Sequence, residues 1–151
     1  MFKRILIIFI IPLFFYGCGY SPLYSNKNNQ NINIKILQTM GDQEINNHLL
    51  SNLSKYSRGQ GKVFLLDIDT NYSILDKSKN LEGSISDYEL LVVARFTVKN
   101  DNLNKIITIR EDILMKNLSD NFEKKNYEKS IKKNFGKSIT NKLILQLSSI
   151  Q

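Results

Sequence analysis

The chain has only one cysteine and one histidine among its 151 residues. The single thiol, Cys18, has no second cysteine for a disulfide or a Cys-ligated metal. His48 has only Glu44 one turn before it, and two groups do not complete a metal site. The sequence also has no Gly-rich phosphate loop, nucleophile elbow or paired-carboxylate motif. We therefore expect no enzyme activity, no metal and no cofactor.

The cysteine lies where a short apolar run ends. Two basic residues precede the run 5–16, which is too short for a bilayer span of about 20 residues but fits a signal-peptide core of about 7–15. Gly17 supplies the small side chain that a signal peptidase requires before Cys18. We predict that residues 1–17 are a lipoprotein signal peptide, cleaved between Gly17 and Cys18, and that Cys18 carries covalent lipid.

This junction resembles the bacterial lipobox, although Phe15 and Tyr16 replace its usual leucine and small residue. The alternative is an uncleaved N-terminal anchor, which the short apolar run disfavours. Two or more acyl chains, at about 0.8 kcal/mol per buried CH₂, would hold the protein stably on a membrane. Gly19 is not the aspartate that favours inner-membrane retention, so we expect an outer-membrane location.

Basic residues outnumber acidic ones, 21 to 14, which gives a formal charge of +7. Such a charge suits an anionic partner such as lipid phosphate. Seven lysines flank the apolar positions of the last predicted helix: Lys124, Lys125, Lys129, Lys132, Lys133, Lys137 and Lys142. The favoured interpretation is a solvated helix side, and contact with lipid headgroups is the alternative. Nucleic acid is disfavoured because no aromatic residues interleave with Lys124-Lys125 or Lys132-Lys133, and because a signal peptide would export the domain.

Hydrophobic periodicity predicts one domain over 32–151, preceded by a lipidated N-terminus and polar tether over 18–31. Ile32, Ile34 and Ile36 alternate with polar residues, as in a half-buried strand. The predicted elements are a strand over 32–38, a helix over 42–57 ended by Gly59 or Gly61, strands over 62–74, 88–98 and 107–115, and a helix from 121 to the C-terminus. The segment 76–84 is expected to be a polar connection, and 100–104 the turn of a hairpin.

The order β-α-β-β-β-α predicts an α+β fold in which two helices pack on one face of a four-stranded, mostly antiparallel sheet. In the long final helix, apolar residues recur four apart at Tyr127, Ile131, Phe135, Ile139, Leu143 and Leu147. We expect this face of the helix to lie on the sheet.

Asp67 and Asp69 point the same way from one predicted strand. Two such carboxylates suggest a shared metal or an acid pair, and so a periplasmic hydrolase. The favoured interpretation is the solvated side of a strand, because no histidine, cysteine or third carboxylate is near them in sequence.

The run Cys18-Gly19-Tyr20-Ser21-Pro22-Leu23-Tyr24 resembles the mature N-terminus of the LPS-assembly lipoprotein LptE family, which often begins Cys-Gly-Phe-x-Pro-Leu-Tyr. The predicted element order is also similar. The resemblance implies a non-enzymatic outer-membrane lipoprotein that plugs the LptD β-barrel, assists its assembly and helps to deliver lipopolysaccharide to the outer leaflet. It also implies that basic side chains contact lipopolysaccharide phosphates. No motif identifies them, and Arg58, Arg95 and Arg110 are candidates only because arginine suits phosphate.

A second function class remains open, that of a lipid-binding auxiliary lipoprotein of an envelope transporter. This alternative requires an apolar pocket between the helices and the sheet.

Overall fold

A computed structural model describes residues 32–101 and 103–150 of the chain. The elements in order are β1 (Ile32–Gly41), α2 (Gln43–Leu53), a 3-10 turn η3 (Ser54–Tyr56), β2 (Lys62–Lys79), β3 (Ile85–Asn100), β4 (Leu103–Lys116) and α3 (Asn121–Ser148). The predicted order β-α-β-β-β-α is confirmed. The boundaries proposed at 1–17 and 18–31, with Gly17 and Cys18, lie outside the described residues.

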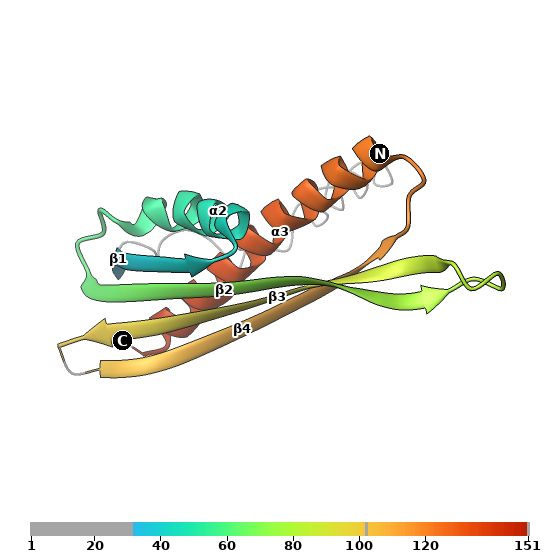
Figure 1. The fold of residues 1–151 in the computed structure, drawn as a ribbon. Coiled ribbons are helices and arrows are strands. Elements are labelled where there is room, and N and C mark those ends of the chain that lie inside the picture. Colours follow the sequence, from blue (N-terminus) through green and yellow to red (C-terminus); the bar gives the residue numbers. More distant parts are fainter. Residues whose placement is uncertain (1–31, 102, 151) are drawn as a thin grey trace, which may run out of the picture.

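The four strands form one sheet in the spatial order β1-β2-β3-β4. β1 pairs in parallel with β2, while β2–β3 and β3–β4 are antiparallel hairpin pairs. The parallel pair requires a crossover, which α2 supplies. Both helices lie on one face of the sheet, and α3 crosses it diagonally (Figure 1). The predicted α+β fold with a mostly antiparallel sheet is therefore confirmed.

Strand alternation builds the core between the sheet and the helices. One row of the sheet joins Phe96 to Ile68 on one side and to Ile107 on the other, and all three side chains are buried. α2 and α3 bury Leu49, Leu143 and the residues around them against this face. The residues between these positions in each strand point to the opposite side of the sheet, which we call the open face.

The hairpin of β2 and β3 is longer than predicted. The segment 76–84 was expected to be a polar connection, but β2 continues to Lys79 and β3 begins at Ile85, which are paired. Asn80 closes the tip, where its Oδ1 accepts hydrogen bonds from the amides of Glu82 at 3.0 Å and Ser84 at 2.9 Å. Backbone pairing of two solvated strands needs no hydrophobic alternation, so the sequence pattern did not reveal it.

α2 is shorter than predicted, since it ends at Leu53 and η3 follows. Gly59 is not the residue that ends it. A Cβ on Gly59 would lie 1.9 Å from the carbonyl oxygen of Ile32, so only glycine permits this approach to β1. Asn33 Nδ2 donates to the Gly59 carbonyl at 2.9 Å and fastens the loop to the start of the strand.

The molecule has two unlike ends. β1 begins at one end, and the β2–β3 hairpin extends beyond β1 and the helices at the other, which we call the distal end (Figure 1). Between residues 32 and 150, as far as the structure describes them, no helix has the length and apolar character needed to cross a membrane.

Candidate functional site

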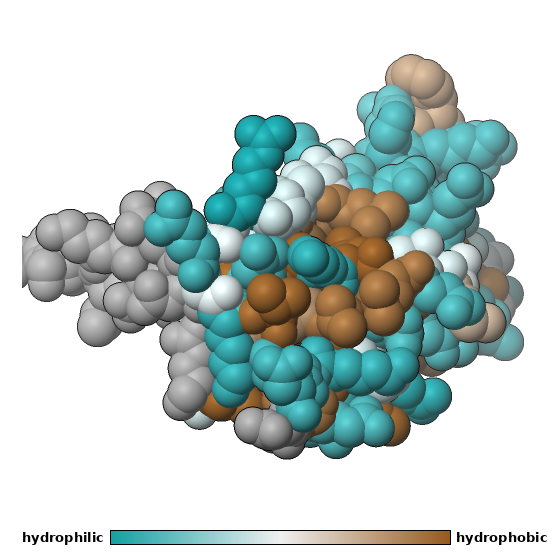
Figure 2. Space-filling view, turned by 90° about the vertical axis from the view of Figure 1, so that its left-hand side faces the viewer, coloured by the Kyte–Doolittle hydropathy of each residue, from teal (hydrophilic) through white to brown (hydrophobic). Residues whose placement is uncertain are grey.

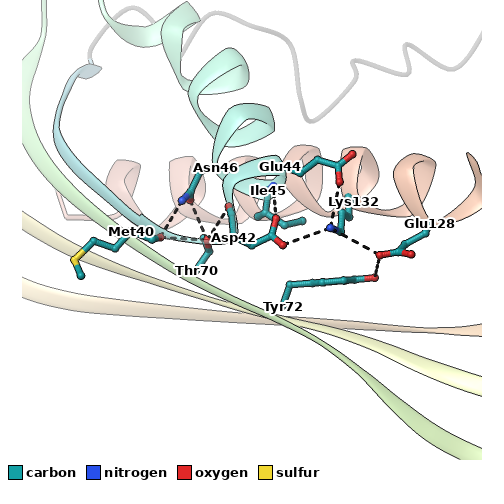
Figure 3. A network of polar contacts seen from close by, with 9 residues as sticks. All are labelled: Met40, Asp42, Glu44, Ile45, Asn46, Thr70, Tyr72, Glu128 and Lys132. Carbon is teal, nitrogen blue, oxygen red and sulfur yellow. Dashed lines mark hydrogen bonds and ion pairs between the residues drawn. The ribbon is translucent and has the colours of Figure 1, made fainter. Parts of the chain in front are cut away.

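The most extensive polar cluster of the described residues lies where α2 begins (Figure 3). Gly41 has a φ of 92°, and a Cβ there would lie 1.7 Å from the carbonyl oxygen of Thr70, so the chain turns from β1 into α2 at a position that only glycine fits. Asp42 follows as the N-cap, and its Oδ1 accepts a hydrogen bond from the Ile45 amide at 2.8 Å.

Lys132 of α3 reaches into this cluster and is almost completely withdrawn from water. Its Nζ lies 3.4 Å from Asp42 Oδ2, 3.1 Å from Glu44 Oε2 and 3.8 Å from Glu128 Oε1, and its side chain is 11% exposed. The ammonium also lies 4.3 Å from the ring centroid of Tyr72. The prediction that Lys132 belongs to the solvated lysines of the last helix is therefore wrong.

The cluster joins three elements through charge. Burial alone acts to lower the pKa of Lys132, but the hydrogen bond to Glu44 and the charge of Asp42 outweigh it, so the pKa is raised. The Tyr72 hydroxyl donates to Glu128 Oε1 at 3.0 Å. Burial, followed by the charge of Glu128, raises the pKa of Tyr72 far above its ordinary value. The ammonium and the phenol therefore stay protonated.

A second group of hydrogen bonds continues the cluster into the core. Thr70 Oγ1 donates to Asn46 Oδ1 at 3.0 Å, and Asn46 Nδ2 donates to the Met40 carbonyl at 2.9 Å. Each of these polar groups has a partner, and among the described residues no group of three or more His, Cys, Asp or Glu side chains is placed to hold a metal ion. The arrangement fixes α2 and α3 on the sheet and holds no free nucleophile.

A signal for this contact is present in the sequence. Lys132, Gly136 and Thr140 recur four apart and are all buried. They form a second row beside the apolar face of α3, and small residues in such a row allow another helix to approach closely. The spacing of apolar residues in α3 alone did not show whether this second row faces α2 or solvent.

His48 lies on the same helix–helix contact. A Cβ added at Gly136 of α3 would lie 2.5 Å from the Cβ of His48. The Nε2 atom of His48 is buried and has no hydrogen-bond partner in the described structure. The α2–α3 contact therefore brings the backbone of α3 close to the Cβ of His48, whose side chain is partly buried there.

Asp67 and Asp69 both lie on the open face, as the strand pattern predicts. Asp67 Oδ2 accepts a hydrogen bond from Lys99 Nζ at 3.0 Å. Asp69 lies directly opposite Arg95 in the register of β2 and β3. The two carboxylates line a surface hollow of about 270 Å³ together with Thr97 and other side chains of neighbouring strands. Each faces a basic residue, which fits the solvated side of a strand.

The three arginines considered for phosphate contact are exposed and do not converge. Arg95 and Arg110 lie on the open face on neighbouring strands, where Arg110 is paired with Val93. Arg58 lies in the loop after η3, on another part of the molecule. The structure brings two of the three to one face and does not build a single site from them.

Exposed apolar side chains mark both ends of the molecule. Several lie on the distal half of the hairpin and the segments beside it: Ile74, Leu75, Leu81, Ile113, Leu114 and Phe122. Figure 2 looks onto the other end and shows hydrophobic side chains gathered among hydrophilic ones. Val63 near the start of β2 and Ile106 near the start of β4 are exposed there, at 40% and 62%.

Tyr127, expected in the core, is 45% exposed because the first turns of α3 bury no residue before Ile131.

The fold is shared with solved structures of bacterial lipoproteins. The structure is similar to the rare lipoprotein B of Shewanella oneidensis, with a TM-score of 0.54, 14% identity and coverage of 77% of this chain and 98% of that one. It is also similar to lipoprotein B of Nitrosomonas europaea, with a TM-score of 0.60, 15% identity and coverage of 88% and 92%. No protein-family model matches the sequence, and no curated protein is similar to it in sequence. The chain thus has a fold that bacterial lipoproteins share.

Proposed function

We propose that this protein is an outer-membrane lipoprotein that acts like LptE, occupying and assisting the assembly of an LptD β-barrel that delivers lipopolysaccharide to the outer leaflet. The observation that carries the proposal is the motif Cys18 to Tyr24, which precedes a domain with the fold of bacterial lipoproteins. Lipid on Cys18 would hold the domain at the membrane and raise its effective concentration at the barrel.

The distal end supports a protein partner. Leu81 at the tip of the hairpin is fully exposed, and Leu114 near the end of β4 is 58% exposed. Apolar groups grouped at one end of a domain are typical of an interaction surface. A wide barrel has a polar lumen that a compact domain can fill, and this domain presents charged residues on its open face and apolar ones at its tip.

Co-purification of the tagged full-length protein from outer membranes in mild detergent tests the proposal. LptD, identified by mass at equal stoichiometry, is the expected companion. Recovery of the protein without a β-barrel would contradict the proposal.

Lipid attachment is tested separately with Cys18→Ser, which should abolish labelling by radioactive fatty acid and leave an unprocessed precursor. Ser21→Ala is the matched control, since it lies outside the cleavage site and should be processed normally. A mature-sized, membrane-held form of the Cys18→Ser protein would contradict lipid anchoring at this residue.

The alternative, a lipid-binding auxiliary lipoprotein of an envelope transporter, has less support. The buried apolar residues form one cluster between sheet and helices. The hollow between β4 and α3, lined in part by Arg110, Lys142 and Leu145, and the hollow beside Phe122 are both surface features. Stoichiometric acyl chains extracted from the purified domain would favour this alternative.

A further inference from the structure

An uncompensated row of lysines runs along α3. Lys125, Lys129, Lys133 and Lys137 are spaced four residues apart, and all are exposed. We call them the lysine stripe. At 1.5 Å per residue the stripe is about 18 Å long. Within the described residues none of the four takes part in an ion pair.

The charges of the stripe are not balanced by carboxylates of the described residues. Like charges at this spacing repel one another on a helix surface. The one carboxylate at a neighbouring position, Glu128, three residues after Lys125, is already bound to Tyr72 and lies 3.8 Å from Lys132. The neighbouring Lys132 differs from the stripe, because its side chain is buried and its ammonium lies close to the carboxylates of Asp42 and Glu44.

A second observation lies at the beginning of the same helix. Phe122 is 74% exposed, and it precedes Lys125 by three residues and Lys129 by seven, so it lies on the same side of α3 as the stripe. It borders a surface hollow of about 400 Å³ that Leu118 and Tyr127 help to line. An exposed aromatic residue beside a row of lysines is typical of helices that lie in a membrane interface.

We propose that α3 docks on an anionic phospholipid surface, with the lysine stripe on the headgroups and Phe122 inserted at their level. A straight row of four cations matches a plane of many phosphates, whereas a single phosphate ligand is bound by groups that converge. The 14 residues from Gly19 to Ile32 could span at most about 50 Å, so lipid on Cys18, as proposed above, would leave the helix room to reach the same membrane. This inference goes beyond the proposed barrel partnership and does not depend on it.

Lysine footprinting tests the proposal on the full chain bound to vesicles. The full chain is reconstituted from detergent into phosphatidylcholine vesicles and into vesicles that also contain phosphatidylglycerol, and only the vesicle-bound fraction is footprinted, so a difference in recruitment does not enter the comparison. We expect acetylation of Lys129 and Lys133 to be about fivefold slower on the anionic vesicles, the factor that one lysine contact contributes to membrane partition. The protection should disappear at about 1 M salt, where the Debye length is about 3 Å. Lys105, exposed on β4, is the internal control and should react equally on both.

Two pairs of variants separate a surface effect from a loss of fold. Lys129→Gln with Lys133→Gln should remove the protection of Lys125 and Lys137, while Lys105→Gln with Lys116→Gln, an equal change in charge, should leave it intact. Phe122→Ser should weaken the protection without changing the helical circular dichroism spectrum.

Equal acetylation of the stripe on both kinds of vesicle would overturn the proposal. Protection by a soluble acidic protein but not by anionic vesicles would also overturn it and assign the stripe to a protein partner. Because the vesicles contain no protein, this footprint and the co-purification of LptD succeed or fail independently.

Discussion

At the scale of single residues, Asp42 and Lys132 show how one side chain serves two elements. Asp42 caps α2 with one carboxylate oxygen and contacts the Lys132 ammonium with the other. The sequence predicted a helix beginning at Asp42, because aspartate before a helical pattern is a local signal. It did not predict the partner of Lys132, because 90 residues separate the pair and only the packing of α3 on α2 brings them together.

Two substitutions of Asp42 separate its cap from its charge. Asp42→Asn keeps an acceptor for the Ile45 amide and removes one of the carboxylates around Lys132, so the free energy of unfolding should fall by about 1 kcal/mol or less. Asp42→Ala removes both interactions and should lower it by about 1 kcal/mol more. Urea unfolding measures both values. If the two variants lose equal stability, the cap contributes nothing and this assignment is wrong.

The same cluster should make stability depend on pH in the alkaline range. The folded-state pKa values of Tyr72 and Lys132 are raised above their ordinary values of 10.0 and 10.5, so the folded protein retains protons that the unfolded chain releases. Their contribution to stability is therefore complete below about pH 10 and is lost as the pH rises further.

We expect Tyr72→Phe to make the decline in unfolding free energy between about pH 9 and 12 shallower than in the wild type. Tyr127→Phe is the matched control, since Tyr127 is 45% exposed, and it should follow the wild-type curve. Parallel curves for Tyr72→Phe and the wild type would show that Tyr72 does not titrate differently in the folded state.

At the scale of elements, the sequence predicted each helix and strand, and the errors lie at their ends and contacts. β2 and β3 were predicted too short because both faces of the distal part of their hairpin are accessible to solvent. Its residues therefore show no alternation of apolar and polar side chains. The α2–α3 contact was missed because its row on α3, which includes Lys132 and Gly136, is not apolar. Hydrophobic periodicity indicates which residues are buried. The length of the hairpin depends instead on backbone pairing, and the α2–α3 contact depends on side-chain size.

The helix–helix contact gives a prediction at this scale. In Gly136→Ala the new Cβ would lie 2.5 Å from the Cβ of His48, so the helices must separate. Alanine is a better helix former than glycine by about 1 kcal/mol, but overpacking costs about 1–3 kcal/mol, and we expect a net loss of stability. Asn134→Ala, at an exposed position of the same helix, should be neutral or stabilising. A gain in melting temperature for Gly136→Ala would contradict this packing.

At the scale of the whole molecule, the element order predicted both the α+β fold and the packing of the two helices on one face of the sheet. The division into a core and a protruding distal end was not predicted. That division depends on how far β2 and β3 extend past β1, and no local pattern sets this length.

The distal half of the hairpin should be dispensable for folding. None of the residues 77–87 is buried, so replacing them with an Asn-Gly turn between Asp76 and Tyr88 should change the free energy of unfolding by about 1 kcal/mol or less. The shortened protein should nevertheless lose co-purification with LptD. A shortened protein that folds and retains the barrel would remove the distal end from the proposed interface, and calorimetry on the same sample checks the fold.

The parallel pairing of β1 with β2 also fixes an order of events. The β2–β3–β4 meander joins neighbours in sequence, whereas Ile32 meets Lys62 only after the chain between them has closed into a loop. β1 should therefore join the sheet last and leave it first, and its amides should exchange with heavy water sooner than those of β3. Because Ile32 is also the residue at which the N-terminal segment enters the domain, tension on that segment would act first on the strand that is held least firmly.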